Sequence, residues 1–264
     1  MKLKKIMSVI LAGAMCLSLA ACGSSKTEKG SDSAEAASSD KLIVATEAGF
    51  APYEYLEGNE VVGVDMDIAK AIAEDMGMEL EIQNMDFDAA LIAVQQDKAD
   101  FAAAGISVDP EREKVMDFST NYVNSTEVVV VNAAEPAVAE PSGEALTDKV
   151  VAVQQGNIAD LWCSNTENTT PKEVKRYTKF ALATEDLKAN KIDCIVMDEL
   201  PAKDLVAANP ELTILEGDPL FVDQYAIAVK KGNTEMLDAI NKVIDKLIAD
   251  GKIDEFIANH SAAK

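Results

Sequence analysis

Histidine, cysteine and aromatic residues are scarce in this chain of 264 residues. His260 is the only histidine, there are four cysteines, and aromatic residues make up 5% of the sequence. A lone histidine argues against a histidine-dependent catalytic triad and against a histidine-rich metal site. The scarcity of aromatic residues argues against a receptor or adhesin domain, because such a domain needs a large exposed apolar or aromatic patch.

The four cysteines are also placed unevenly. Cys16 and Cys22 lie near the start, which leaves Cys163 and Cys194 for the rest of the chain. Two cysteines are too few for a disulfide scaffold. They form either one disulfide or two unpaired core residues. The second alternative is favoured, because nothing in the sequence sets the distance between them.

Basic residues are heavily outnumbered by acidic ones. The chain has 24 Lys and Arg residues against 46 Asp and Glu residues, for a net charge of −22. Such a charge repels phosphate backbones, and the basic residues are scattered rather than clustered, so a nucleic-acid partner is excluded. An acidic solvated surface that keeps an exported protein soluble is the favoured interpretation.

The longest apolar run covers residues 6–21 and follows Lys2, Lys4 and Lys5. It contains no charged residue, and it is shorter than the roughly 20 residues that a membrane-spanning helix needs. The combination of a basic start and a short apolar run is typical of an export signal. We therefore expect an exported protein rather than one with a permanent transmembrane helix.

The end of this run, Leu-Ala-Ala followed by Cys22, resembles the lipobox of bacterial lipoproteins. In a lipobox the cysteine thiol accepts diacylglycerol, and the cysteine becomes the new amino terminus. This predicts a lipoprotein signal peptide at residues 1–21 and a protein held by its lipid chains, palmitate included, at the outer face of the cell membrane. The alternative is an ordinary secretory signal with a chance cysteine.

Residues 22–40 have no large apolar side chain and are expected to form a flexible tether.

From Lys41 onward, short β-branched runs alternate with runs of helical periodicity, which predicts parallel sheets in an α/β fold. Strands are expected at residues 41–46, 80–83, 101–104, 127–131, 150–153, 192–197, 212–215 and 225–229, and helices at residues 64–76, 87–96, 158–163, 180–189, 200–208, 236–248 and 253–258. We expect residues 41–131 and 223–264 to form a first lobe and residues 132–222 a second. Two chain crossings between the lobes would then form a hinge.

Several motifs in this part resemble the polar amino-acid-binding proteins of ABC importers, the family 3 bacterial solute-binding proteins. They are VATEAGFAPYEY (44–55), GVDMDIA (63–69), MDF (85–87), AGIS (104–107), ER (111–112), DFS (117–119), VAVQQG (151–156) and YAIAVKKG (225–232). Each motif is short, but the ordered set covers nearly all of residues 41–258. The resemblance implies a periplasmic-binding-protein-like fold, with two α/β lobes joined by a two-strand hinge.

A site for a free amino acid must neutralise a carboxylate and an ammonium together, because an unpaired buried charge is unstable. The resemblance makes Arg112 the partner of the carboxylate, with Gly105 and Ser107 nearby, and the planar guanidinium suits that role. The alternative for Arg112 is a surface position within a charged run. Asp198, at the end of an apolar strand, is the candidate for the ammonium, and helix capping is its alternative.

The second lobe is expected to clamp the ligand with Gln154, Gly156 and Asn157, at a turn whose amide groups attract an anion. Ile158 departs from the family pattern there, because it stands where relatives commonly have a small or hydroxyl residue. For the ligand side chain, Phe50 and Phe87 stand where relatives place aromatic walls, although core packing also explains them. Glu47 stands where relatives with polar or cationic ligands carry Asp.

These features predict a lipid-anchored binding protein that captures a free amino acid, with a polar or basic side chain, and delivers it to an ABC permease driven by its ATPase. We expect a monomer without catalytic residues, metal or cofactor. The rival functions are a dehydratase-like enzyme on the same fold, in which Glu47 or Asp198 would act as acid or base, and an extracellular receptor or adhesin domain.

Overall fold

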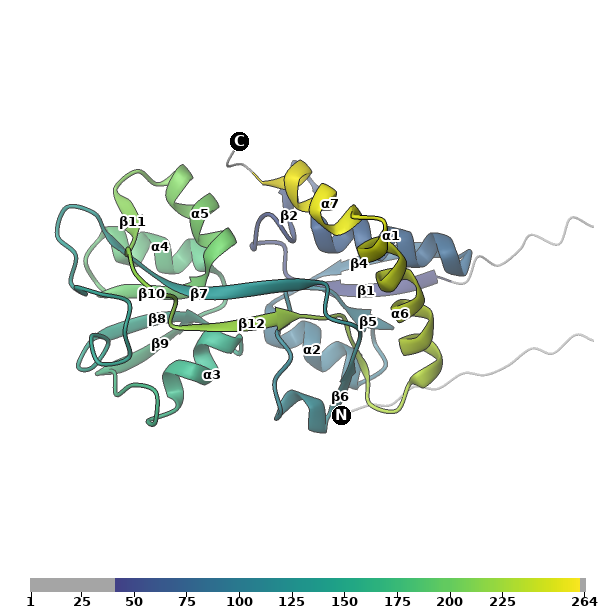
Figure 1. Ribbon diagram of the computed structural model, residues 1–264, viewed down its shortest axis with the longest axis horizontal. Helices are drawn as coiled ribbons and strands as arrows, with labels where there is room; N and C mark the ends of the chain where they lie inside the picture. The colour runs from purple at the N-terminus through teal and green to yellow at the C-terminus, as the bar shows by residue number, and fades with distance from the viewer. Residues whose placement is uncertain (1–40, 262–264) are drawn as a thin grey trace, which may run out of the picture. The chain divides into compact units, whose positions relative to one another are not determined.

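The computed structural model describes residues 41–261, which form two lobes, each built on a β-sheet (Figure 1). The first lobe contains both ends of this part of the chain, and the second contains its middle. The predicted α/β fold with two lobes is thereby confirmed. The predicted signal peptide, its Cys22 and the predicted tether lie outside the described residues.

The sheet of the first lobe has the strand order β4-β1-β5-β13-β6. Its strands are β1 (Lys41–Thr46), β4 (Glu79–Asn84), β5 (Phe101–Ala102), β6 (Met116–Phe118) and β13 (Ala228–Lys230), and its helices are α1 (Val64–Met76), α2 (Phe87–Gln95), α6 (Thr234–Ala249) and α7 (Lys252–His260). A small hairpin of β2 (Tyr55–Glu57) and β3 (Glu60–Val62) precedes α1. Strands β4, β1 and β5 are parallel, whereas β13 is antiparallel to β5 and β6.

The sheet of the second lobe has the order β11-β7-β10-β8-β9, and β12 also pairs with β7. Its strands are β7 (Val123–Asn132), β8 (Val150–Gln154), β9 (Glu173–Tyr177), β10 (Cys194–Asp198), β11 (Leu212–Ile214) and β12 (Phe221–Tyr225), and its helices are α3 (Ile158–Ser164), α4 (Phe180–Lys188) and α5 (Glu199–Ala208). Strands β10, β8 and β9 are parallel, and β7 is antiparallel to β10. Both sheets are therefore mixed rather than wholly parallel as predicted, because the chain runs in the opposite direction where it crosses between lobes.

Successive side chains of a strand point to opposite faces of its sheet, and both faces are buried, as expected when helices cover both. In β1, Leu42 and Val44 belong to the core cluster that includes α1 and α6, whereas Ala45 belongs to the cluster that includes α2. In β7 the consecutive residues Val128 and Val129 likewise face different clusters. This double burial explains why the predicted strands contain runs of apolar residues. Within residues 41–261, no helix is both long enough and apolar enough to cross a membrane.

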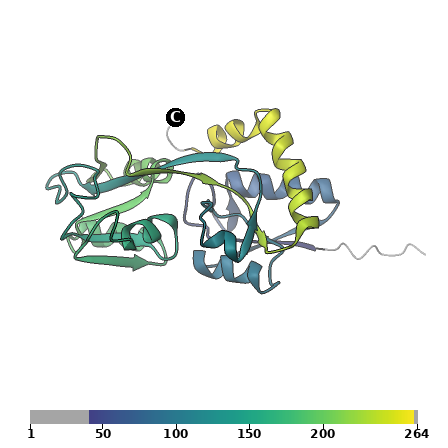
Figure 2. The same cartoon turned by 60° about the horizontal axis from the view of Figure 1, so that its bottom comes forward.

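The hinge consists of β7 and β12, which lie side by side and pass between the lobes (Figures 1 and 2). The two strands are antiparallel, with Tyr225 opposite Val123 and Phe221 opposite Glu127. The predicted strand at residues 225–229 is in fact two strands, because β12 ends at Tyr225 and β13 begins at Ala228. Between Tyr225 and Ala228 the chain stops pairing with β7 and begins to pair with β5 and β6 in the first sheet.

Candidate functional site

The ten residues predicted to bind the ligand lie between the two lobes. Seven of them line a small cavity of about 10 Å³: Phe50, Phe87, Gly105, Ser107, Gln154, Asn157 and Asp198, together with Ala104 and Ile158. The other three contact this group, because Glu47 bonds to Gln154, and Arg112 bonds to Ser107 and Gly156. A volume of this size holds about one water molecule. A larger solute therefore enters only when the lobes or the lining side chains move apart.

The topology of the sheets explains why residues so distant in sequence converge. Glu47 directly follows β1, Gly105 lies shortly after β5, and Asp198 is the last residue of β10. These are the carboxyl ends of parallel strands, where ligands bind in open α/β sheets. Gly105 has a φ of +53°, and a Cβ atom at this position would lie 2.7 Å from Cε1 of Phe50. A glycine is therefore required for Phe50 to approach the backbone.

Arg112 is buried, which contradicts the alternative of a surface position. It begins a short 3₁₀ turn, and its guanidinium donates to the carbonyl of Ser107 (2.7 Å) and, in the second lobe, to the carbonyl of Gly156 (2.8 Å). Its Cζ atom lies 5.5 Å from the centre of the Phe87 ring. Burial lowers the pKa of Arg112 to about 10, so the side chain is still a cation at neutral pH. The site thus contains a desolvated positive charge that is bonded to carbonyl oxygens.

The turn between β8 and α3 differs from the prediction of free amide groups. The amide of Gly156 donates to Oδ2 of Asp160 (3.0 Å), and the side chain of Asn157 accepts from the amide of Asp160 (2.9 Å). The predicted amide donors at this turn are therefore corrected for Gly156, because an acidic side chain of the same helix already occupies its N–H group. The carbonyl of Gly156 is the group that faces Arg112.

Asp198 stands at the N-cap position of α5, but its side chain makes no capping hydrogen bond. Its Oδ1 atom instead accepts hydrogen bonds from Ser125 Oγ (2.8 Å) and from the hydroxyl of Tyr225. The alternative of a helix cap is therefore wrong. Burial, followed by repulsion from the Asp223 carboxylate, raises the pKa of Asp198. A cation placed beside Asp198 would relieve this repulsion.

Two further acids near Asp198, the buried Glu127 and the half-buried Asp223, were not predicted as site residues. Glu127 of β7 is completely buried, and burial raises its pKa well above the ordinary value. Asp223 of β12 accepts a hydrogen bond from the hydroxyl of Ser107. Glu127 was visible as a single charge before a run of valines in a predicted strand, and that pattern could have marked it. Asp223 carried no such signal, because it reaches the site only through the pairing of β12 with β7.

The opposite end of the site is lined by Glu47 and aromatic rings. The ring of Phe50 stacks against Tyr53 (centroids 5.9 Å apart) and against Phe180 of the second lobe (6.0 Å). Glu47 is 1% exposed, and its Oε2 atom accepts from Nε2 of Gln154 at 2.9 Å. Burial raises the pKa of Glu47 despite this hydrogen bond. Phe180 was not predicted as a site residue, because its approach to Phe50 depends on how the lobes meet.

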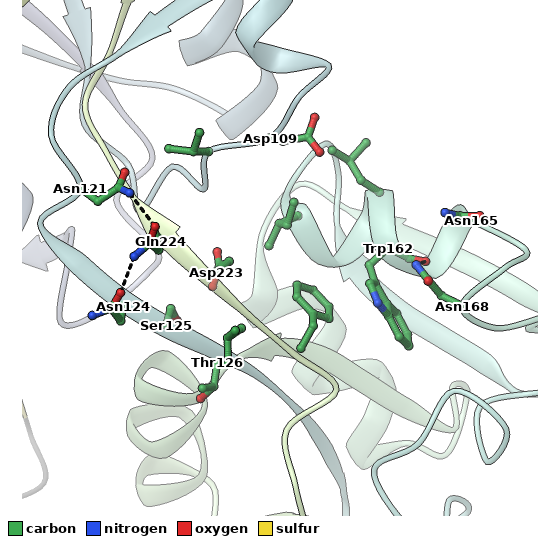
Figure 3. Close-up of a pocket in the computed structure, with 15 residues that line it drawn as sticks. Asp109, Asn121, Asn124, Ser125, Thr126, Trp162, Asn165, Asn168, Asp223 and Gln224 are labelled. Carbon is green, nitrogen blue, oxygen red and sulfur yellow. Dashed lines mark hydrogen bonds between the residues drawn. The ribbon is translucent and has the colours of Figure 1, made fainter.

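A larger groove of about 820 Å³ runs beside β12 (Figure 3). Gln224 links two other polar residues of the groove: its side chain accepts a hydrogen bond from Asn121 (2.6 Å) and donates one to Asn124 (2.7 Å). Trp162 and Phe221 stack in its wall, with centroids 5.3 Å apart. None of the ten predicted residues lines this groove. We place the candidate site in the smaller cavity, because Asp198 lines it and the opposite charge, Arg112, is hydrogen-bonded to Ser107 in its wall.

Metal and disulfide chemistry have no support in the described part of the chain. Among residues 41–261, no group of His, Cys, Asp and Glu side chains could hold a metal ion. Cys163 and Cys194 are both buried and unpaired, which agrees with the favoured alternative of two core cysteines.

Two hinged lobes with a polar site between them define a solute-binding protein. Residues 42–262 match the family described as bacterial extracellular solute-binding proteins, family 3. The chain therefore belongs to this family, and the predicted class of solute-binding protein, rather than enzyme, is confirmed.

Three comparisons illustrate this relationship. The arginine-binding extracellular protein ArtP of Bacillus subtilis (strain 168) is 28% identical over 255 residues, which cover 96% of each chain. The arginine-bound structure of AbpA, an amino acid ABC transporter substrate-binding protein of Streptococcus pneumoniae, is 36% identical with a TM-score of 0.76, over 83% of this chain and 94% of that one. An ancestral arginine-binding protein bound to glutamine is 33% identical with a TM-score of 0.72, over 83% and 97%. These descriptions agree with the predicted amino-acid-binding class.

Proposed function

We propose that this protein captures a free amino acid with a polar or basic side chain and delivers it to an ABC permease and its ATPase. The observation that carries the proposal is the presence, in one interlobe site, of both a buried cation, Arg112, and a buried acid, Asp198. An amino acid presents a carboxylate and an ammonium close together, so one group can face each side chain. The relatives described above, with arginine or glutamine as ligands, support the same class.

The proposed capture proceeds by closure of the lobes. With the lobes apart, the ligand carboxylate would take the hydrogen bonds that Arg112 donates to carbonyl groups, in the stronger form of a paired ionic contact. The ligand side chain would lie between the Phe50 ring and Glu47, which also belong to the first lobe. Closure then brings Asp198 of the second lobe to the ligand ammonium, and adds Gln154 and Phe180 from the same lobe. These extra contacts favour the closed form, which the permease would recognise.

A thermal-shift screen against the common amino acids tests this function. The soluble part, from about residue 40 onward, is mixed with each amino acid in turn, because a ligand that binds only the folded state raises the melting temperature. We expect a clear rise with one or a few polar or basic amino acids. The protein should first be unfolded and refolded to remove any ligand retained from the cell. No rise with any amino acid after that treatment would refute the proposal.

We further propose that a lipid on Cys22 holds the protein at the extracytoplasmic face of the membrane as a monomer. The apolar run and the lipobox-like sequence that ends at Cys22 support the anchor. A Cys22→Ser variant should lose incorporation of labelled palmitate and move from the membrane fraction into the supernatant. A Cys16→Ser variant is the matched control and should stay in the membrane fraction. Membrane retention of the Cys22→Ser variant would argue for a different anchor.

A further inference from the structure

The side-chain end of the candidate site contains a second cation that comes from the other lobe. Lys179 directly precedes α4 in the second lobe, and its Nζ atom lies 3.6 Å from Oε1 of Glu47 in the first lobe. Its neighbour Phe180 stacks on Phe50, so the same short segment contributes both a ring and a charge to this end of the site. The side chain of Lys179 is 42% exposed, whereas that of Glu47 is 1% exposed.

The two oxygen atoms of Glu47 are in different situations. Oε2 accepts a hydrogen bond from Gln154, but Oε1 is buried and has no hydrogen-bond partner. The 3.6 Å between Oε1 and Lys179 is too long for a hydrogen bond, although the two charges still attract each other. Glu47 thus has a positive charge nearby, but its Oε1 atom still lacks a hydrogen-bond donor. A ligand side chain with an N–H group would meet that need.

In the part of the protein that the structure describes, the other charged groups around Glu47 are acids, so Lys179 is the positive charge that a cationic ligand would meet there. Repulsion from Asp86 raises the pKa of Glu47, and Glu47 in turn raises the pKa of the buried Glu54. Lys179 is the cation within ion-pair distance of Glu47 among the described residues. A guanidinium or ammonium group of a ligand would therefore have to share Glu47 with Lys179 and be repelled by it. A neutral amide would donate to Oε1 without any such repulsion.

We infer that Lys179 is a specificity-determining residue, which disfavours ligands with cationic side chains relative to neutral ligands with an N–H donor. The inference rests on the proposed function, and it adds a residue outside the predicted site. Lys179 acts when the lobes meet, because it belongs to the second lobe and Glu47 to the first. Since Lys179 is partly exposed, it can turn into solvent when a cationic ligand binds. Its effect on affinity is therefore moderate rather than absolute.

The test compares the affinities of the parent protein and a Lys179→Met variant by isothermal titration calorimetry at pH 8. Methionine keeps much of the apolar stem and removes the charge. We expect the variant to bind L-arginine about fivefold more tightly than the parent, because partly exposed ion pairs have effects of this size. Affinity for L-glutamine should change by less than about twofold, since a neutral head group is not repelled. The gain for arginine should shrink as the salt concentration rises.

A Lys191→Met variant is the matched control, because Lys191 pairs with Asp186 in the same lobe and does not contact the site. Its affinities should equal those of the parent. A second variant, Glu47→Gln, leaves Lys179 without its acid, and we expect it to bind arginine more weakly than the parent. Adding Lys179→Met to Glu47→Gln should recover part of that loss.

Unchanged or weakened arginine binding in a folded Lys179→Met variant would overturn the inference while leaving the proposed function intact. Loss of arginine and glutamine affinity by the same factor would also overturn it, because Lys179 would then only stabilise the closed lobes. If the refolded parent protein bound no amino acid at all, the proposed function itself would fail, and the inference with it. Amino-acid binding by the parent protein therefore distinguishes failure of the inference from failure of the proposed function.

Discussion

Gln154 in the second lobe donates a hydrogen bond from Nε2 to Oε2 of Glu47 in the first lobe, at 2.9 Å. The acceptor is a buried carboxylate, so this contact is of the charge-assisted, stronger kind. It joins the lobes beside the cavity that the predicted ligand residues line. Lobe closure and recognition of the ligand side chain therefore depend on the same carboxylate.

Replacing Gln154 should weaken the closed form of the protein. In a Gln154→Ala variant, we expect amino-acid affinity to fall by about tenfold, mainly through faster dissociation, because a hydrogen bond to a charged group is lost. Stopped-flow fluorescence would measure the dissociation rate. Gln155→Ala is the control, because Gln155 makes its cross-lobe hydrogen bond with Asp88 at an exposed position. Equal effects of the two variants would contradict a special role for Gln154.

Replacing Arg112 should abolish capture. Arg112→Ala removes the buried cation and leaves the carbonyl groups of Ser107 and Gly156 without their donor. We expect an affinity loss of at least about 100-fold, since truncation of a buried charged partner has effects of several kcal/mol. Calorimetry would measure it, with Lys114→Ala as the control from the same turn, where the lysine is exposed. Parental affinity in Arg112→Ala would show that another group binds the carboxylate.

Binding should release protons through Asp198. Burial raises the pKa of Asp198, so part of the ligand-free protein carries the protonated acid near neutral pH. An ammonium favours the ionised acid, lowers its pKa and expels the proton, and affinity should therefore rise with pH between about 5 and 7.5. Calorimetry in two buffers with different ionisation enthalpies would count the protons. Asp198→Asn should bind weakly and without this pH dependence. Net proton uptake by the parent would refute the assignment.

The stability of the protein should increase as the pH falls from 6 towards 4, because of Asp65. Its carboxylate accepts hydrogen bonds from the Gly105 amide and the Tyr122 hydroxyl, but burial still raises its pKa from 3.8 to about 6. In that pH range the folded state holds a proton that the unfolded chain has released. The shift corresponds to roughly 2 to 3 kcal/mol in the free energy of unfolding.

Urea unfolding at pH 6.5 and pH 4.5 would measure this effect of Asp65. Asp65→Asn should reduce the difference between the two pH values, because the substituted side chain does not titrate. Asp75→Asn is the control, since Asp75 is an exposed partner of Lys242. If Asp65→Asn kept the full difference, other buried acids such as Glu54 would have to account for it.

Adding a methyl group at Gly105 should displace the aromatic wall of the site. Gly105→Ala places Cβ at 2.7 Å from the Phe50 ring, in a backbone conformation with a φ of +53°. Gly77→Ala is a matched control, because Gly77 has a similar φ of +67° with no atom within 4 Å of the added Cβ. Each variant should lose about 1 kcal/mol or more through the backbone. Only Gly105→Ala should also lose ligand affinity, which calorimetry would detect. Equal ligand affinities in the two variants would show that the position of Phe50 does not affect binding.

Much of the fold followed from local patterns. The strand at Lys41–Thr46 and the helix at Val64–Met76 have the predicted bounds. Strands β2, β3, β6 and β9 were not predicted, and β12 was predicted only at its last residue. In β9 only partly buried and exposed side chains occur, so the apolar pattern on which prediction depends is weak. The break between β12 and β13 was missed as well, because the residues on both sides of it are apolar and only their change of partner strand separates them.

By itself, the sequence determined the α/β class, the order of most elements and ten residues that lie together between the lobes, seven of them lining one cavity, because local periodicity and family motifs are carried by neighbouring residues. The tertiary structure alone decided that Glu127 and Asp223 lie beside Asp198, and that Lys179 and Phe180 reach Glu47 and Phe50. Those contacts depend on the register of β7 with β12 and on the meeting of two lobes. Such long-range geometry leaves no pattern in any single stretch of the chain.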